Sequence, residues 1–466
     1  MLGTNSQTPA FNTILLIALV ALGALTGILI AIYGFSPLIV AVPLALIFLL
    51  ITVNKPWIAL SAFFLLVPLE NLFVLEGELS ATGSKLIGAY LIFLMLICGR
   101  LKYISEVFRH KKTLWIIGFL LAALISTLFS DIASALFENL LRLFIFTALY
   151  IVLIVMIRDI KTLTYCLQAL VAGAALSVLS PLILGTGSTG GIDLQRYGGL
   201  WGDQNEFAAI LLVIIPFSLM LYQYERKKIM KMLYGASFMV ILIGFFLTYS
   251  RGGFVAFLVL FLLASYRIIK SKHRVKILAI FIPAVIVLSA VFYNTIADEY
   301  ISRVETLRAI QNNESAAVDG SIKLRYIYYF EVAPEIFFNN PIFGVGPGGF
   351  IHYNTYLKQV AHNTYIEILI GMGLLGFIPF LVILYLTWRE VKATQFTSIH
   401  INELKLLYYY STALEFGFIS LLVAGMFISL DLNKILWLSI TLSTVMANIL
   451  RNQILSERNL SQSSYS

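Results

Sequence analysis

The stretch from Ala361 to Leu386 opens with Ala361-His362-Asn363-Thr364. It continues as Tyr-Ile-Glu-Ile-Leu-Ile-Gly-Met-Gly-Leu-Leu-Gly-Phe-Ile-Pro-Phe-Leu-Val-Ile-Leu-Tyr-Leu386. About 20 mostly apolar residues are needed for a helix to cross the ~30 Å hydrocarbon core of a membrane. The stretch therefore predicts a membrane span, and His362 lies where the chain enters that span.

A glycine-rich segment precedes this span and reads Asn340-Pro-Ile-Phe-Gly-Val-Gly-Pro-Gly-Gly-Phe350. Its four glycines let the backbone take positive φ or pass close to a ligand, and its two prolines fix the chain on either side. We interpret the rest of the chain as a membrane frame that brings arginine side chains to His362.

The composition supports such a frame. The chain has 466 residues, of which 60% are hydrophobic and 12% are charged, whereas ordinary soluble domains carry roughly 25% charge. A transmembrane barrel is excluded because the apolar runs are continuous rather than alternating over about ten residues. The sequence therefore predicts an all-α, polytopic membrane bundle. Cys98 and Cys166 lie inside apolar runs, where we expect them to be small core residues.

The apolar runs predict 12 to 14 spans, and the short run at 85–99 is alternatively re-entrant. No cleavable signal peptide is expected, because residues 1–12 lack basic residues. The expected spans are 13–33, 36–53, 57–75, 85–99, 113–129, 137–157, 162–184, 205–223, 232–249, 252–268, 277–293, 363–386, 405–428 and 431–449.

The basic residues predict the orientation. With both termini in the cytoplasm, cytoplasmic segments collect 22 of the 32 Lys and Arg residues, as the positive-inside rule requires. The formal net charge of +8 is then an orientation signal rather than a nucleic-acid patch, so we expect a bilayer and no nucleic acid as partner.

The longest external segment runs from about Asn294 to Ala361. Apolar residues every three to four positions predict an amphipathic helix over 296–310, and Ser321 is expected to cap a second helix from Ile322 to Phe338. The expected organisation is N-terminal spans over 1–184, spans with motif loops over 185–293, the external helical loop over 294–361, C-terminal spans over 362–450 and a cytoplasmic tail over 451–466.

Two arginines lie in glycine-containing external loops. Arg196 stands in Asp193-Leu-Gln-Arg196-Tyr-Gly-Gly-Leu-Trp201, and Arg251 in Thr248-Tyr-Ser-Arg251-Gly-Gly253. Arg251 is confined to a tight hairpin between two spans, and an arginine near hydrocarbon costs at least ~2.5 kcal/mol, so it is usually paired or functional. Snorkelling to the interface is the alternative.

Arg325 and His362 belong to the same side of the predicted bundle. Arginine forks bind the paired oxygens of phosphates and diphosphates, and a neutral histidine accepts a proton from a hydroxyl near pH 7. Together they indicate transfer from a diphosphate leaving group to an alcohol, with His362 as the catalytic base, Arg196 and Arg251 as diphosphate ligands, and Arg325 as a further diphosphate- or substrate-binding residue. No cofactor is expected, and no external His/Cys cluster or Asp-x-Asp pair predicts a metal site.

Three further residues are expected to support this site, namely Asp203, Asn205 and Asn363. For Asp203 a structural interpretation competes with this one. Glu206 follows it by three residues and an apolar run comes next, which is typical of a capping box at a helix start.

These motifs resemble the O-antigen ligase and polymerase family of bacterial envelope glycosyltransferases. The resemblance lies in Arg196-Tyr-Gly-Gly-Leu-Trp-Gly-Asp-Gln-Asn205-Glu-Phe-Ala, in Tyr249-Ser-Arg251-Gly-Gly-Phe, in Arg325 with the 340–350 segment, and in Ala361-His362-Asn363-Thr-Tyr-Ile-Glu. These motifs, taken in order, span roughly residues 190 to 375. One departure is that Tyr328 and Tyr329 stand where the family often has tryptophan after the arginine.

The resemblance implies a GT-C-like, inverting and metal-independent glycosyltransferase at the outer face of the bacterial inner membrane. Its donor would be an undecaprenyl-diphosphate-linked glycan, and its acceptor a lipid-linked repeat or a lipid A core. The acceptor decides between a polymerase, which we favour slightly, and a ligase. A protein O-oligosaccharyltransferase and a transporter or flippase for lipid-linked sugars remain as alternatives.

Overall fold

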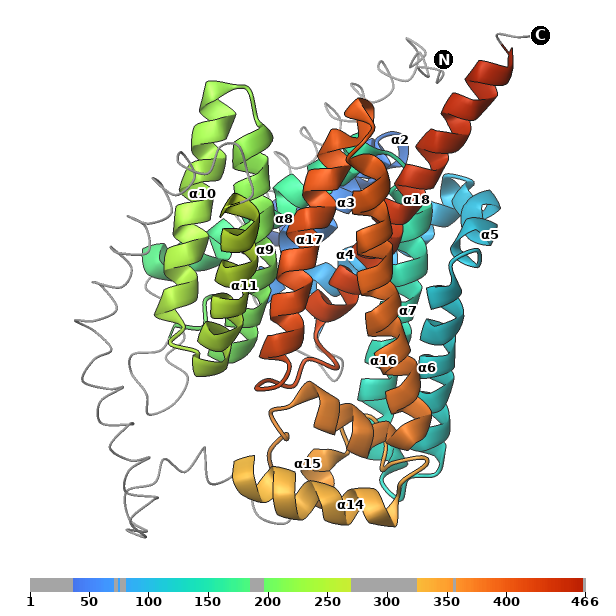
Figure 1. Cartoon of the computed structure of the whole chain (residues 1–466), viewed down its shortest axis with the longest axis vertical. Coiled ribbons are helices and arrows are strands. Elements are labelled where there is room, and N and C mark those ends of the chain that lie inside the picture. Colours follow the sequence, from blue (N-terminus) through green and yellow to red (C-terminus); the bar gives the residue numbers. More distant parts are fainter. Residues whose placement is uncertain are drawn as a thin grey trace.

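The computed structural model describes residues 37–70, 74–75, 81–184, 197–269, 325–354 and 358–463. Two of the expected spans, 13–33 and 277–293, lie outside these residues, as do Arg196, Ser321 and the amphipathic helix expected over 296–310. Within the described residues the chain is a bundle of helices with one minimal hairpin of two-residue strands (Figure 1).

The helices follow the apolar runs of the sequence. They are α2 (Pro37–Asn54), α3 (Pro56–Leu66), α4 (Gly83–Ile97), α5 (Ile104–Val107), α6 (Lys111–Leu128), α7 (Ala133–Met156), α8 (Ile160–Leu184), α9 (Gln204–Tyr224), α10 (Lys228–Leu247), α11 (Arg251–Ile269), α14 (Ala333–Asn339), α15 (Phe350–Tyr353), α16 (Thr364–Ser398), α17 (Lys405–Ala424) and α18 (Lys434–Ser463). The strands β1 (Val74–Leu75) and β2 (Ala81–Thr82) pair antiparallel. Single turns of 3₁₀-helix cover Arg100–Tyr103 and Asn402–Leu404, and a π-helical turn covers Tyr328–Val332.

The expected polytopic all-α architecture is confirmed. Seven of the described helices are long and apolar enough to cross a membrane, and an eighth span results if α4 and the bent segment Arg100–Val107 count as one. That pair bends by 94°, which fits the re-entrant alternative for 85–99.

Several expected boundaries are wrong. The span expected over 57–75 ends at Leu66, because Pro68 has no N–H to continue the helical hydrogen bonds. The spans expected to end at 386 and 449 continue as α16 and α18 to Ser398 and Ser463, so the expected tail after 450 begins as helix.

Helix α9 lies in the interior of the bundle and packs against α10 and α17. Every residue from Phe207 to Ser218 is buried, as expected for a helix that is apolar all round. Gly417 allows the close approach of α17, because a Cβ at this position would lie 3.0 Å from the Cα and carbonyl oxygen of Val213. Membranes supply no hydrophobic driving force between helices, so the close van der Waals packing that small residues allow drives their association instead.

Helix α16 is broken at Gly373, whose φ of 57° lies outside the helical region. A break leaves carbonyl and N–H groups of the helix without their usual partners. The glycine-rich segment supplies partners on both sides of the break. Its backbone bonds are Val345 N to Ile370 O (3.0 Å), Gly346 N to Gly371 O (2.6 Å), Leu374 N to Pro341 O (2.9 Å) and Leu375 N to Ile342 O (3.1 Å).

The glycines in this segment are therefore used for a close approach of backbone to backbone. Gly344 and Gly346 have φ of 70° and 97°, and a Cβ at Gly344 would lie 2.5 Å from the carbonyl oxygens of Ile370 and Gly371. The segment fixes the first half of α16, and with it the position of His362.

A buried ion pair connects α6, α16 and α18. The Lys112 ammonium group is buried and donates to the Glu390 carboxylate (2.7 Å), the Thr387 hydroxyl (3.3 Å) and the Ile440 carbonyl (2.8 Å). The hydroxyls of Ser443 and Thr444 donate to the same carboxylate, at 3.0 and 2.9 Å. Buried charges are tolerated when they are paired and hydrogen-bonded in this way.

Candidate functional site

The sequence motifs gather at one end of the bundle, where α14, α15 and the segment between α17 and α18 lie (Figure 1). We call this the motif end and define it by residues 197–206, 248–252, 325–339, 358–367 and 425–434. The helices α9, α11, α16 and α18 all begin there.

The Arg251 motif is joined to the start of α9. The hydroxyl of Ser250 donates to the side-chain oxygen of Asn205 (2.8 Å), and the Ser250 oxygen accepts the N–H of Gly253 (3.2 Å). Only three residues separate α10 from α11, and Tyr249 among them has a φ of 49°. The predicted tight hairpin is confirmed, with the half-buried Arg251 as the first residue of α11.

His362 lies in the turn before α16 and has a φ of 53°, a left-handed conformation that non-glycine residues rarely adopt. Three neighbours hold this turn. The Tyr329 hydroxyl donates to the His362 carbonyl (3.1 Å). The Asn363 side chain accepts the N–H groups of Tyr365 (3.0 Å) and Ile366 (3.2 Å), so it caps α16.

Glu367 completes the support of this turn, and the sequence reasoning did not select it. Its buried carboxylate accepts the backbone N–H of Ala361 and the hydroxyl of Ser429 (3.3 Å). A buried carboxylate one turn into a membrane helix is costly without such partners. Its place in an apolar span, five residues after His362, was the sequence signal that could have pointed to Glu367.

Burial and two neighbouring charges act on the pKa of the His362 imidazole. Burial lowers the pKa of His362 below its usual value, the positive charge of Arg325 lowers this pKa further, and the negative charge of Asp203 opposes both. The side chains of Arg325 and Asp203 therefore lie within electrostatic range of the histidine. A neutral imidazole at pH 7 can accept a proton.

Tyr329 belongs to the π-helical turn Tyr328–Val332 that follows Arg325. The described residues 325–339 are helical, as predicted for the 322–338 helix, of which only the first three residues lie outside the described part. The turn places the Tyr329 hydroxyl on the His362 carbonyl.

Asp203 has the structural role that competed with a ligand role. Its carboxylate accepts the N–H groups of Asn205 and Glu206, both at 2.8 Å, so it caps α9. The reciprocal half of the predicted capping box is wrong. Glu206 instead accepts from the indole N–H of Trp201 (2.9 Å) and the side-chain amide of Asn433 (2.8 Å).

The segment 425–433 connects the groups around His362 and Arg251. The sequence did not predict this segment, because the spans expected over 405–428 and 431–449 leave almost no loop between them. The carbonyl of Met426 accepts from the Asn363 amide (3.2 Å). The next residue, Phe427, packs on Gly252, where an added Cβ would lie 2.5 Å from the Phe427 Cβ. The residues that follow His362 and Arg251 thus contact consecutive residues of one segment.

The same segment carries a buried acid. Burial raises the pKa of Asp431, and the negative charge of Glu206 adds to this effect. Asp431 is held by the Trp437 indole, which donates to its carbonyl oxygen (2.8 Å). Polar residues at 429, 431 and 433 within an otherwise apolar sequence were the signal for this segment.

The comparison with known protein families agrees with this geometry. Residues 236–381 match the family model described as O-Antigen ligase. The match covers 381 − 236 + 1 = 146 of the 466 residues and supports an assignment to a family of membrane glycan ligases and polymerases. No curated protein matches the chain.

The matched residues contain Arg251, Arg325 and His362, together with Asn363. Asp203, Asn205 and the 425–433 segment lie outside them. Asn205 and Met426 contact the matched residues directly, through Ser250 and Asn363. Of the predicted diphosphate ligands, Arg196 lies outside the described residues. Its neighbour Tyr197 donates its backbone N–H to Leu247 (3.1 Å), four positions before Arg251.

The matched residues and their surroundings thus combine an imidazole of lowered pKa with at least one nearby guanidinium group. Among the residues that the structure describes, no three His, Cys, Asp or Glu side chains are grouped so that they could hold a metal ion. The groups present can accept a proton and bind an anionic leaving group.

Proposed function

We propose that this protein transfers a glycan from an undecaprenyl-diphosphate carrier to a hydroxyl group of an acceptor sugar. The observation that carries the proposal is the environment of His362, where burial and the charge of Arg325 lower the pKa of the imidazole. A general base must be unprotonated at the working pH, and it is most efficient when its pKa lies near that pH.

In the proposed reaction the acceptor hydroxyl gives its proton to the imidazole of His362 as its oxygen forms a bond to the anomeric carbon. The bond between that carbon and the diphosphate oxygen breaks, and the diphosphate leaves with the bonding electron pair. Attack opposite the leaving group inverts the anomeric configuration.

The leaving diphosphate gains negative charge in the transition state, which cationic groups aimed at it stabilise. Arg251 and Arg325 are the described candidates, and Arg196 is proposed with them on the sequence resemblance. Guanidinium groups are suited to this role because they are permanently charged and bind two oxygens at once.

We place the motif end on the external face of the bacterial inner membrane, with both termini in the cytoplasm. The support is the distribution of Lys and Arg, since 22 of 32 then lie on the cytoplasmic side. In this orientation the site opens where lipid-linked glycans are assembled outside the cytoplasm.

Purified full-length protein is incubated with a defined undecaprenyl-diphosphate oligosaccharide, and the products are separated on a gel. A ladder indicates a polymerase, a shift that requires lipid A core indicates a ligase, and a shift that requires an acceptor protein indicates a protein O-oligosaccharyltransferase. His362→Ala and Arg251→Ala are expected to reduce product at least about 100-fold.

The matched control is Arg226→Ala, an exposed arginine in the loop between α9 and α10, which is expected to leave product formation unchanged. Product at the wild-type level from His362→Ala would overturn the proposed role of the histidine. Movement of the carrier lipid across a vesicle membrane without glycan transfer would favour the transporter.

A further inference from the structure

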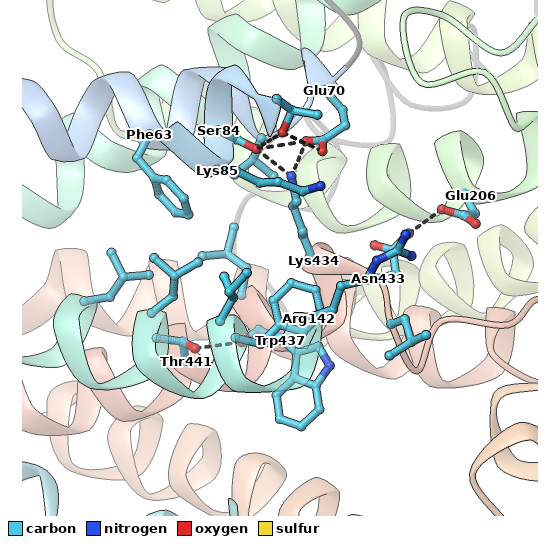
Figure 2. Close-up of a pocket in the computed structure, with 18 of the residues that line it drawn as sticks. Phe63, Glu70, Ser84, Lys85, Arg142, Glu206, Asn433, Lys434, Trp437 and Thr441 are labelled. Carbon is cyan, nitrogen blue, oxygen red and sulfur yellow. Dashed lines mark hydrogen bonds and ion pairs between the residues drawn. The ribbon is translucent and has the colours of Figure 1, made fainter. Parts of the chain in front are cut away.

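Two cationic side chains of the cavity in Figure 2 are already engaged by carboxylates of the protein. This cavity of about 280 Å³ lies between α3, α4, α7 and α18 and reaches the motif end. The Lys434 ammonium group donates to the Glu70 carboxylate, and the charge of Arg142 acts on the carboxylates of Glu206 and Asp431. These two positive charges therefore leave no surplus that would select an anionic ligand.

A second polar cluster lies at the end of the bundle opposite to the motif end, where α11 and α16 end and α17 begins. It is centred on Arg267 of α11. The guanidinium group donates to four side chains on the two neighbouring helices, namely the Tyr408 hydroxyl (3.2 Å), the Thr412 hydroxyl (2.9 Å), the Gln395 side-chain oxygen (3.1 Å) and the Glu415 carboxylate (3.1 Å). The cluster therefore joins α11 to both α16 and α17.

Two cations of this cluster share one carboxylate. The Glu415 carboxylate accepts from Arg267 through one oxygen and is paired with the Lys392 ammonium group of α16 through the other. The Glu415 side chain is 7% exposed, whereas those of Arg267 and Lys392 are 31% and 41% exposed. The carboxylate thus lies behind the two cations, and these three side chains present one net positive charge on the outer side.

Lys392 is the member of the cluster that can bind a further anion directly. The four bonds of Arg267 involve both of its terminal nitrogens, so its N–H groups are largely committed. An ammonium group carries three N–H donors, and in the described part of the chain Lys392 has one ion pair, with Glu415. Lys392 therefore retains donors for another acceptor, and Arg267 adds its charge nearby.

An open pocket of about 470 Å³ lies over these two cations, between α11, α16 and α17. Lys392, Arg267 and Tyr408 form its polar side. Its apolar side is formed by Phe396 and Ile399, which are 75% and 52% exposed. Among the residues that the structure describes, no carboxylate lines this pocket. The pocket therefore combines positive charge with exposed apolar surface.

A phospholipid matches this combination. The pocket lies near the ends of α16 and α17, two helices that are long and apolar enough to cross a membrane, so it falls at the level where hydrocarbon meets headgroups. Basic pockets between transmembrane helices bind anionic lipid headgroups. A soluble anion would satisfy the positive charge but would leave Phe396 and Ile399 uncovered, whereas an acyl chain covers them.

We infer that this pocket binds the headgroup of an anionic phospholipid. Its phosphate lies at Lys392, where the ammonium N–H groups donate to phosphate oxygens, and an acyl chain lies over Phe396 and Ile399. The orientation proposed above assigns this lipid to the cytoplasmic leaflet. The binding itself depends neither on that orientation nor on glycan transfer.

Two helices that the cluster joins carry candidate site residues at their other ends. Arg251 is the first residue of α11, and His362 lies in the turn before α16. A bound phosphate offsets the net positive charge of the cluster and so strengthens the connection between α11 and α16. Because a ligand that binds only the folded state stabilises it, we expect an anionic lipid to raise the melting temperature of the protein.

Purified full-length protein in a neutral detergent is titrated with phosphatidylglycerol or with phosphatidylcholine of the same acyl chains, and bound lipid is counted by native mass spectrometry. We expect the wild type to bind phosphatidylglycerol at least about fivefold more tightly and Lys392→Gln to lose that preference, because one basic residue near a lipid surface supplies an attraction of this size. The variant is compatible with folding, because Glu415 keeps its bond to Arg267. Lys392→Arg retains the charge and is expected to bind like the wild type.

Lys161→Gln is the matched control. Lys161 is an exposed lysine at the start of α8. It lies at the same end of the bundle, since the hydroxyls of Thr164 in α8 and Tyr410 in α17 are hydrogen-bonded (3.1 Å). This variant should bind phosphatidylglycerol like the wild type, and the lipid should raise the melting temperatures of both but not that of Lys392→Gln.

Equal affinity of the wild type for the two lipids, or a Lys392→Gln variant that keeps the preference, overturns the inference. Glycerol 3-phosphate, which has the phosphate group without acyl chains, separates a lipid from a soluble phosphate ester. We expect it to leave phosphatidylglycerol bound. Displacement of the lipid by glycerol 3-phosphate at comparable concentrations would overturn the assignment of the pocket to a lipid.

Discussion

The hydroxyl of Tyr329 donates a hydrogen bond to the backbone carbonyl of His362 at 3.1 Å. This contact joins the π-helical turn after Arg325 to the strained turn before α16. Because His362 has a positive φ, which costs of order 1–3 kcal/mol at a non-glycine residue, its surroundings must hold it in place.

Tyr329→Phe removes this hydrogen bond and retains the ring. One such bond contributes ~1 kcal/mol, so we expect glycan transfer to fall several-fold while the amount of protein in the membrane stays unchanged. The comparison is initial rates of product formation by the purified wild type and variant. An unchanged rate would mean that Glu367 and Asn363 position the histidine without the tyrosine.

The charges around His362 predict opposite effects of two substitutions on the pH dependence of transfer. The base must be unprotonated, so kcat/KM rises with pH and levels off above the pKa of His362. Arg325→Gln removes a positive charge that lowers this pKa, so the rise in kcat/KM moves to higher pH.

Asp203→Asn removes a negative charge that raises the pKa of His362, so the rise in kcat/KM moves to lower pH. Asparagine caps helices about as well as aspartate, so α9 is preserved. The measurement is kcat/KM from pH 5 to 8 for both variants and the wild type. Profiles that coincide, once normalised to their plateaus, would show that His362 is not the titrating base.

The sequence predicted those parts of the fold that a local apolar pattern determines. The runs at 113–129, 205–223 and 252–268 correspond to α6, α9 and α11 within a few residues, because a span is dictated by the thickness of the bilayer. The hairpin at Arg251 followed in the same way from an apolar stretch too long for one helix.

Contacts between distant segments could not be predicted in this way. The bond from Ser250 to Asn205 joins residues 45 positions apart, and that from Asn363 to Met426 joins residues 63 positions apart. Nothing in either local sequence specifies the partner, because the packing of the helices determines which residues meet. For the same reason the roles of Glu206, Glu367 and Asn433 became visible only in the structure.

The backbone connection between the glycine-rich segment and α16 predicts a strong effect at Gly346. This residue has a φ of 97°, and an added Cβ would lie 2.0 Å from the Cδ1 of Leu136. Gly346→Ala therefore combines backbone strain with a steric clash, and we expect it to destabilise the protein by roughly 2–4 kcal/mol. Thermal unfolding in detergent measures the effect.

Gly118→Ala is the matched control, because Gly118 lies within α6 and an added Cβ would meet no atom within 4 Å. Alanine is favoured over glycine in a helix by ~1 kcal/mol, so this variant should be at least as stable as the wild type. Equal melting temperatures for the two variants would contradict the proposed tight contact at Gly346.

The buried ion pair of Lys112 and Glu390 predicts that removing one charge is worse than removing both. Lys112→Met leaves the half-buried Glu390 carboxylate with only hydroxyl and histidine partners, and breaking a buried pair costs up to about 3–5 kcal/mol. Adding Glu390→Gln removes the remaining charge, and the amide can still accept hydrogen bonds from Ser443 and Thr444. The double variant should therefore unfold at a higher temperature than Lys112→Met in the same detergent. If instead the two variants melt together, the lone Glu390 carboxylate carries no penalty, and the hydroxyl groups of Ser443 and Thr444 suffice to satisfy it.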